Sequence, residues 1–203
     1  MAGNLVQFDL QFQKKYSNIV GLDEAGRGAW AGPVVAAAAI MPLDDPIAGI
    51  NDSKKLTPKK RDVLFDEIKT KALCYGIGMI DSVEIDAINI LEASKKAMLI
   101  ALGQLSVEPG FLLVDGNMTL DTDFAQQFVI EGDAKSYSIA AASILAKVTR
   151  DRLMCDLSKT YPDYAFESHK GYGTKKHQEA LKAHGCLDIH RKSYKPIAKI
   201  ISS

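Results

Sequence analysis

The chain has 203 residues, of which 47% are hydrophobic and 25% are charged, and its 25 basic side chains balance its 25 acidic ones. These values are typical of a globular protein with a core of ordinary size. A membrane-spanning protein is not expected, because no stretch reaches the roughly 18 uninterrupted apolar residues of a membrane span. Residues 1–17 are too polar for a signal peptide. We therefore expect a cytoplasmic protein with no membrane partner.

Charge is distributed unevenly along the chain. Residues 1–132 hold 12 basic and 18 acidic side chains, whereas residues 133–203 hold 13 basic and 7 acidic ones and all four histidines. An acidic region that gathers metal ions, joined to a basic region that follows phosphates, suits a nucleic-acid enzyme. The alternative is that the acidic and basic regions are only solvent-exposed surfaces without a binding role. The three cysteines are odd in number and far apart, which predicts reduced thiols and no zinc site.

The pattern of apolar residues predicts strands first and longer helices later. The expected strands cover residues 19–25, 34–41, 74–80, 111–114 and 128–131. Four helices are expected. The first has Thr57 as its N-cap and Pro58 in its first turn. The other three cover residues 90–105, 136–160 and 174–184. The apolar face of the first helix is expected to contain Val63, Leu64, Phe65, Ile68 and Leu73. Thr174 caps the last helix, and Gly185 ends it.

The segment after the first expected strand carries the strongest functional pattern. Asp23 and Glu24 end an apolar run and lead into Gly26-Arg27-Gly28. Carboxylates at a strand end offer hard oxygen ligands to a divalent cation. The glycines let backbone amides and a guanidinium approach an anionic or hydroxyl-bearing substrate closely. An ordinary acidic turn is the alternative, but the second buried strand that follows favours a functional site.

Two further aspartates, Asp115 and Asp133, also follow apolar strands and lie beside glycines. If the three strands are neighbours in one sheet, four carboxylates converge, and cations have to offset their repulsion. Two divalent ions about 3.5–4 Å apart, held by such carboxylates, promote phosphodiester hydrolysis. A single strand-end aspartate is more typical of a turn, so it is the threefold coincidence that favours a metal site.

Seven segments, in order along the chain, resemble the signatures of ribonuclease HII. They are residues 21–35, 52–56, 114–117, 132–136, 139–151, 169–174 and 190–191. The resemblance extends over nearly the whole chain and implies an α/β fold, an RNase H-like mixed β-sheet flanked by helices, with a helical C-terminal extension. We therefore expect an N-terminal lead-in of residues 1–18, a catalytic core of residues 19–160 and a substrate-binding extension of residues 161–203.

The resemblance also implies an activity. It implies an endonuclease that hydrolyses the RNA strand of RNA–DNA hybrids and cuts 5′ to ribonucleotides embedded in duplex DNA, with a role in replication and repair. The cofactor would be Mg²⁺ or Mn²⁺, with two ions in the active complex. The residues that match the family's metal-binding acids are Asp23, Glu24, Asp115 and Asp133.

Substrate recognition is implied at two places. Gly26, Arg27 and Gly28 match the turn that senses a ribose 2′-hydroxyl, which is the group that distinguishes RNA from DNA. Tyr172 matches the tyrosine that stacks on the sugar at an RNA–DNA junction. The family usually has proline after this turn, whereas this chain has Ala29, so we expect a looser turn. The next residue, Trp30, is expected to pack beneath the turn.

Basic residues supply further expected contacts. Lys54 and Lys170 are expected to contact the substrate, with a solvated loop as the alternative for Lys54. His169 is expected to be structural or to contact a phosphate, rather than to act as a proton shuttle. A duplex-binding stripe is expected to contain Lys170, Lys175, Lys176, Arg191 and Lys192.

Two other classes compete with this interpretation. One is a non-catalytic hybrid-binding module of the same fold, which the presence of all four acids disfavours. The other is ribonuclease HIII, which carries an extra N-terminal domain and lacks the Gly-Arg-Gly turn; about eighteen residues precede the first expected strand here. We expect a monomer, and no sequence pattern identifies a replication-clamp partner.

Overall fold

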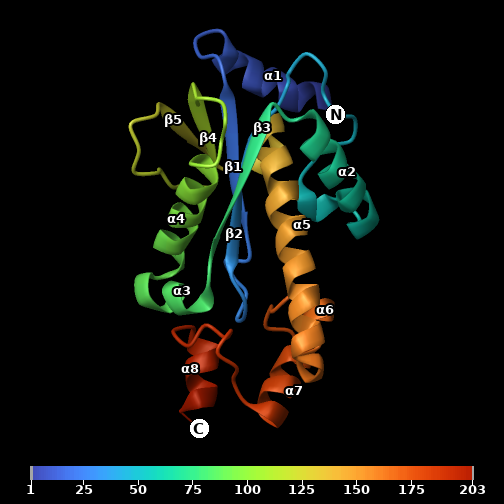
Figure 1. Ribbon diagram of the computed structural model, residues 1–203, viewed down its shortest axis with the longest axis vertical. Helices are drawn as coiled ribbons and strands as arrows, with labels where there is room; N and C mark the ends of the chain where they lie inside the picture. Colours follow the sequence, from blue (N-terminus) through green and yellow to red (C-terminus); the bar gives the residue numbers. More distant parts are fainter. Residues whose placement is uncertain (1, 203) are drawn as a thin grey trace.

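The computed structural model describes residues 2–202, and a five-stranded mixed sheet lies at its centre (Figure 1). The strands are β1 (Ile19–Ala25), β2 (Val34–Ile40), β3 (Cys74–Ile80), β4 (Phe111–Asp115) and β5 (Gln126–Val129). Their order across the sheet is β3-β2-β1-β4-β5. β2 is antiparallel to both β1 and β3, and β4 is parallel to both β1 and β5. The central strand β1 therefore has a partner on each side.

Helices cover both faces of this sheet. They are α1 (Ala2–Gln13), α2 (Pro58–Lys71), α3 (Ser82–Ile88), α4 (Ile90–Leu102), α5 (Tyr137–Thr160), α6 (Phe166–His169), α7 (Lys175–His184) and α8 (Lys195–Ile201). Short 3₁₀ turns are η1 (Ser53–Lys55), η2 (Gly132–Ala134) and η3 (Pro162–Tyr164). In Figure 1, α4 lies on one side of the sheet and α5 with α2 on the other, and each side has its own apolar core. No described helix combines the length and the apolar character needed to cross a membrane.

The longest helix, α5, lies directly on β1 because both contacting surfaces are made of small residues. The alanines at 140–142 are fully buried in this contact region. A Cβ atom on Gly21 would lie 2.0 Å from the carbonyl carbon of Ser138, so this approach requires glycine. Ser136 caps the helix by accepting a hydrogen bond from the Ile139 N–H over 3.2 Å. The close packing brings side chains of α5 beside the end of β1.

The helices α7 and α8 lie at the opposite end of the molecule from α1 (Figure 1). With α6 they form a third apolar cluster, which includes Met154 of α5 and Ala31 of the loop after β1. An antiparallel bridge between Ala31 and His190 adds a backbone contact. The C-terminal part is therefore packed against the loop that follows Asp23 and Glu24. The division of the chain at residue 160 stays a prediction.

The main expectations about the fold are confirmed. The sheet is mixed, helices flank it, and the C-terminal part is helical. Thr57 and Thr174 act as N-caps, accepting hydrogen bonds from the N–H groups of Lys60 and His177. All three cysteines are free thiols.

Other expectations were wrong in detail. β5 begins and ends two residues before the predicted strand 128–131, because Glu131 has a left-handed φ of 55° that turns the chain away from the sheet. The helix predicted over residues 90–105 ends at Leu102. Val63 and Leu73 were predicted on the apolar face of α2 but are 52% and 58% exposed, since Leu64, Phe65 and Ile68 alone supply that face. Helices α1, α3, α6 and α8 were not predicted.

Candidate active site

Two of the predicted acids are neighbours across the central pair of parallel strands. In the register of β1 and β4, Leu22 lies opposite Val114. Asp23 and Asp115 are the next residues on the two strands, so their side chains lie side by side on one face of the sheet. Glu24 follows directly and is also largely buried, with an 8% exposed side chain. Three carboxylates therefore lie near the end of β1.

The fourth acid, Asp133, reaches the same place because the chain turns back after β5. The turn η2 that contains it begins directly after the left-handed residue Glu131. The N–H of Gly132 donates a hydrogen bond of 2.7 Å to Oδ1 of Asp115, which ties this turn to β4. From η1, Lys54 Nζ donates to Oδ2 of Asp133 over 3.3 Å. A lysine from another element thus meets the acid cluster.

The carboxylates are held close enough to disfavour full ionisation. Burial raises the pKa of Asp23 well above its usual range, and the negative charges of Asp115 and Glu24 raise it further. Burial also raises the pKa of Glu24, although the guanidinium of Arg27, 3.3 Å away, opposes this effect. Burial raises the pKa of Asp133 despite the ammonium group that it binds.

This donor set fits divalent cations. Oε2 of Glu24 is buried and has no hydrogen-bond partner, and such an oxygen favours a nearby cation. Carboxylate oxygens are the ligands that Mg²⁺ and Mn²⁺ prefer. Among residues 2–202, no three His, Cys, Asp or Glu side chains are already gathered as a metal site. Instead, Arg27 binds Oε1 of Glu24 and Lys54 binds Oδ2 of Asp133, so basic side chains occupy part of the donor set.

A cavity of about 390 Å³ lies beside the carboxylates. It joins two of the four acids, Asp23 and Glu24, to most of the predicted recognition residues, whereas Asp115 and Asp133 do not line it. Its lining includes Asp23, Glu24, Gly26, Arg27, Gly28, Ser53, Lys54, Ser143, Lys147 and Tyr172. The structure thus brings together residues that are up to about 150 positions apart in the sequence.

The two glycines of the turn have different surroundings. Gly26 has a φ of 97°, and a Cβ atom there would lie 2.0 Å from Nε of Arg150. The protein interior therefore requires glycine at this position. A Cβ atom on Gly28 would meet only the ring of Tyr172, with Cε1 at 4.0 Å. Glycine at position 28 leaves an open gap between the turn and Tyr172.

Ala29, which stands where the family usually has proline, is buried beside this turn. Its N–H donates a hydrogen bond of 3.2 Å to the carbonyl of Gly26, which proline lacks the hydrogen to form. The expected looseness of the turn stays a prediction. Trp30 is half-buried, and a Cβ atom on Gly173 would lie 2.2 Å from its ring, so Trp30 is a packing residue as expected.

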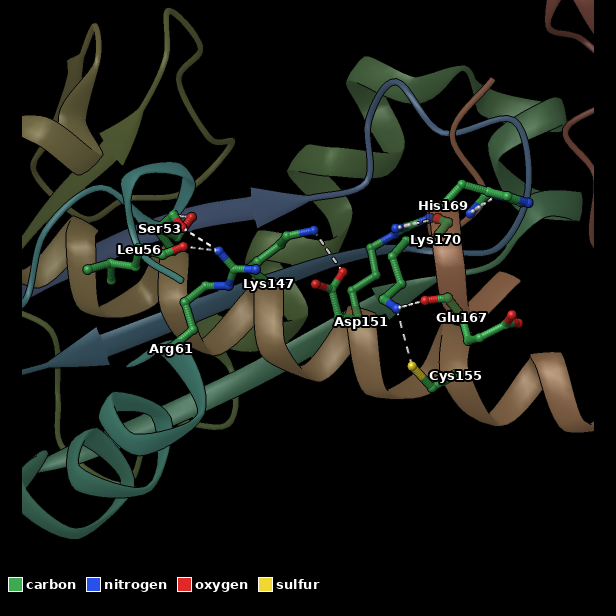
Figure 2. Close-up of polar contacts among 12 residues, drawn as sticks. Ser53, Leu56, Arg61, Lys147, Asp151, Cys155, Glu167, His169 and Lys170 are labelled. Atoms are coloured by element: carbon green, nitrogen blue, oxygen red, sulfur yellow. Dashed lines mark hydrogen bonds and ion pairs between the residues drawn. The ribbon is translucent and has the colours of Figure 1, made fainter. Parts of the chain in front are cut away.

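Lys147, Ser143 and Ser53 line the cavity but were not predicted as site residues. Lys147 Nζ forms a 2.7 Å ion pair with Asp151 (Figure 2). The same atom lies 5.9 Å from the centre of the Tyr172 ring. The hydroxyls of Ser53 and Ser143 are 2.9 Å apart and join η1 to α5. The sequence signal that could have identified Lys147 is its spacing of four residues from Asp151, shortly after the run of small residues in α5.

Lys170 is not among the residues that line this cavity. Its Nζ donates hydrogen bonds to the carbonyl of Glu167 and to Sγ of Cys155, the latter over 3.3 Å (Figure 2). Its contact with substrate therefore stays a prediction. His169 is buried, with Nε2 2.8 Å from the carbonyl of Tyr164, which supports the structural interpretation.

Arg191 does not belong to the predicted surface stripe, and including it there was wrong. Its side chain is fully buried. The guanidinium binds backbone carbonyls of the loop after β1, so no part of it faces a duplex. Lys175, Lys176 and Lys192 are exposed and remain predicted members of the stripe.

The chain is similar to known proteins over nearly its whole length. A family model described as Ribonuclease HII matches residues 20–197. The chain is 53% identical over 189 residues to the ribonuclease HII of Bacillus cereus strain Q1. The aligned region covers 93% of this chain and 73% of the relative. The ribonuclease H2 of Pyrococcus horikoshii OT3 is similar in structure, with a TM-score of 0.76, 29% identity and coverage of 91% and 97% of the two chains.

A second solved structure is the PCNA:RNase HII complex from Archaeoglobus fulgidus, with a TM-score of 0.74, 26% identity and coverage of 88% and 95% of the two chains. The family match spans nearly the whole chain and includes every carboxylate of the cluster. The chain therefore belongs to the ribonuclease HII family and is a divalent-metal-dependent ribonuclease H of type 2 that acts on RNA–DNA hybrids.

Proposed function

We propose that this ribonuclease cuts 5′ to a single ribonucleotide embedded in duplex DNA, as well as within continuous RNA–DNA hybrids. One observation carries this proposal: Asp23 and Glu24 share a cavity with the Gly26–Gly28 turn and Tyr172. The carboxylates serve phosphodiester hydrolysis, and a glycine turn can contact a ribose 2′-hydroxyl without contacting a base. Hydrolysis is thereby directed to a phosphate next to a ribonucleotide.

Asp23, Glu24, Asp115 and Asp133 are the proposed ligands of two Mg²⁺ or Mn²⁺ ions. When bound, such ions lower the pKa of the attacking water and offset the charge of the phosphate. The unpaired Oε2 of Glu24 and the raised pKa of Asp23 support the need for cations here.

The recognition residues have separate proposed roles. Arg27, whose side chain is 41% exposed, can leave Glu24 and contact the substrate when a cation takes its place. Lys54 and Lys147 contribute positive charge beside the acids, which suits phosphate binding. Tyr172 stacks on the deoxyribose that follows the ribonucleotide, and the gap at Gly28 leaves room for the sugar.

The products test the mechanism. We expect 3′-hydroxyl and 5′-phosphate ends from a DNA duplex with one ribonucleotide, in the presence of Mg²⁺ or Mn²⁺ and not after chelation. An attack by water, rather than by the 2′-hydroxyl, gives these ends. A 2′,3′-cyclic phosphate product would refute the mechanism.

The proposed setting is ribonucleotide removal during DNA replication and repair, by a monomer in the cytoplasm. The free cysteines suit a reducing compartment. A replication clamp is a further proposed partner, because the Archaeoglobus relative was solved in a complex with PCNA. Size-exclusion chromatography tests both proposals. Co-elution of the chain with a purified bacterial clamp would support the clamp as a partner. The elution volume of the chain alone would show whether it is a monomer.

A further inference from the structure

Two arginines, Arg150 of α5 and Arg191 before α8, are the largest fully buried side chains of the described chain. Burying a charged group is unfavourable unless hydrogen bonds replace its water. All the hydrogen bonds of these guanidinium groups go to backbone carbonyls and one tyrosine hydroxyl, and none goes to a carboxylate. Burial lowers the pKa of Arg150 to about 10, which leaves it charged at neutral pH.

Arg150 joins the loop after β1 to the loop that carries Tyr172. Its Nε donates to the carbonyl of Pro33 over 2.9 Å, and one terminal nitrogen donates to that of Ala31 over 3.1 Å. The other terminal nitrogen donates to the carbonyl of Lys170 over 2.9 Å. One planar group thus holds two segments that are more than a hundred residues apart in the sequence.

Arg191 holds the other part of the same loop. It donates to the carbonyl of Gly32 through Nε and a terminal nitrogen, over 3.1 and 2.9 Å. Its remaining terminal nitrogen donates to the carbonyl of Arg27 over 2.8 Å. The hydroxyl of Tyr194 donates to the same carbonyl over 2.6 Å. The Gly26–Gly28 turn is thereby tied to the C-terminal part.

These contacts define the gap in front of Tyr172. The guanidinium carbon of Arg150 lies 5.4 Å from the centre of the Tyr172 ring, and the Nε atom lies directly against Gly26. Gly28, on the open side of the turn, faces the same ring. A substitution of Arg150 therefore moves the turn relative to Tyr172. It leaves the acid cluster untouched, because Arg150 forms no hydrogen bond with a carboxylate.

We propose that Arg150 and Arg191 are positioning residues that set the width of the gap between the Gly26–Gly28 turn and Tyr172, and thereby the selection of a ribonucleotide followed by deoxyribose. This inference rests on the proposed function. A continuous hybrid has no deoxyribose after the cut, so it depends less on the width of the gap.

The test compares Arg150→Lys with the wild-type chain on two substrates, a DNA duplex with one ribonucleotide and a continuous RNA–DNA hybrid. A lysine ammonium lacks the planar fork that reaches three carbonyls at once. We expect kcat/KM to fall about tenfold on the single ribonucleotide and at most about threefold on the hybrid. The Mg²⁺ concentration for half-maximal rate should stay unchanged, because the carboxylates are untouched.

Arg152→Lys is the matched control, since it makes the same change two residues away on α5, where Arg152 is exposed and paired with Asp62. Its substrate ratio should equal that of the wild type. An unchanged ratio in Arg150→Lys, or an equal shift in the control, overturns the inference. If Arg150→Lys is unfolded at the assay temperature, Tyr194→Phe decides by the same ratio, because it removes one tether of Arg27. A wild-type chain that cuts only the continuous hybrid refutes the proposed function instead.

Discussion

Substitution of the glycine at position 28 should separate stability from activity. A methyl group on Gly28 would meet only Cε1 of Tyr172, at 4.0 Å, so the fold accommodates it. We expect Gly28→Ala to change stability by between zero and a gain of about 1 kcal/mol, because alanine restricts the unfolded chain. The methyl group would occupy the gap in which we propose that the sugar lies. Loss of a nucleotide contact of about 1–3 kcal/mol lowers the rate on a single ribonucleotide about 5- to 150-fold.

Gly26→Ala gives the opposite result at the other glycine of the turn. Its φ of 97° and the Nε of Arg150, 2.0 Å from a Cβ atom, make alanine strained. Strain of about 1–3 kcal/mol corresponds to a melting temperature lowered by roughly 2–12 °C for a chain of this size. Thermal melts and initial rates on both variants form the assay. Full activity of Gly28→Ala, or a large loss of its stability, would refute the reasoning about the gap.

Three further predictions concern the acids, the tyrosine and the buried histidines. Asp115→Asn should abolish cleavage while hybrid binding, measured by fluorescence anisotropy, persists; a near-normal rate at saturating Mg²⁺ would remove this acid from the site. Tyr172→Ala should lower the rate about 5- to 150-fold on a single ribonucleotide and by less on a continuous hybrid. An equal loss of rate on both substrates, with a lower melting temperature, would make the ring structural. Burial lowers the pKa of His177 and His190 from 6.5 to about 4, so the unfolded chain binds protons that the folded chain does not between these pH values. Above pH 6.5 the free energy of unfolding is then independent of these groups. Below pH 6.5 it decreases by roughly 1.4 kcal/mol per histidine and pH unit. Denaturant titrations at pH 7.0 and 5.5 check this decrease, and equal unfolding midpoints would contradict it.

The sequence predicted those helices that carry their own local signals. Thr57 and Thr174 were recognised because a capping side chain acts within its own first turn. The exception is α3, whose N-cap Asp81 accepts a hydrogen bond from the N–H of Glu84 and which was nevertheless missed. Helix α1 was missed because a helix of 12 residues depends on tertiary packing rather than on intrinsic preference. Phe12 of α1, for example, stacks on Phe111 of β4 at 5.0 Å between ring centres. That partner is about a hundred residues away.

The acid cluster was predictable in outline because Asp23 and Asp115 each mark the end of an apolar strand. Their convergence follows from strand order, which a single sequence suggests only through a resemblance. The burial of Arg191 was not predictable, because arginine is almost never buried unless polar groups surround it. Here those groups are carbonyls of a loop 159 positions away. Local sequence carries no sign of such acceptors.

The distance between Gly32 and Arg191 also matters during synthesis. Chains emerge from the ribosome N-terminus first, at about 5–20 residues per second. The 159 positions between these two residues therefore correspond to roughly 8–30 s, during which the glycine turn exists without its last tether. All four carboxylates are translated before Arg150, Tyr172 and Arg191. The nascent chain thus acquires its four carboxylates before Tyr172 and the two arginines that are proposed to position the turn against it.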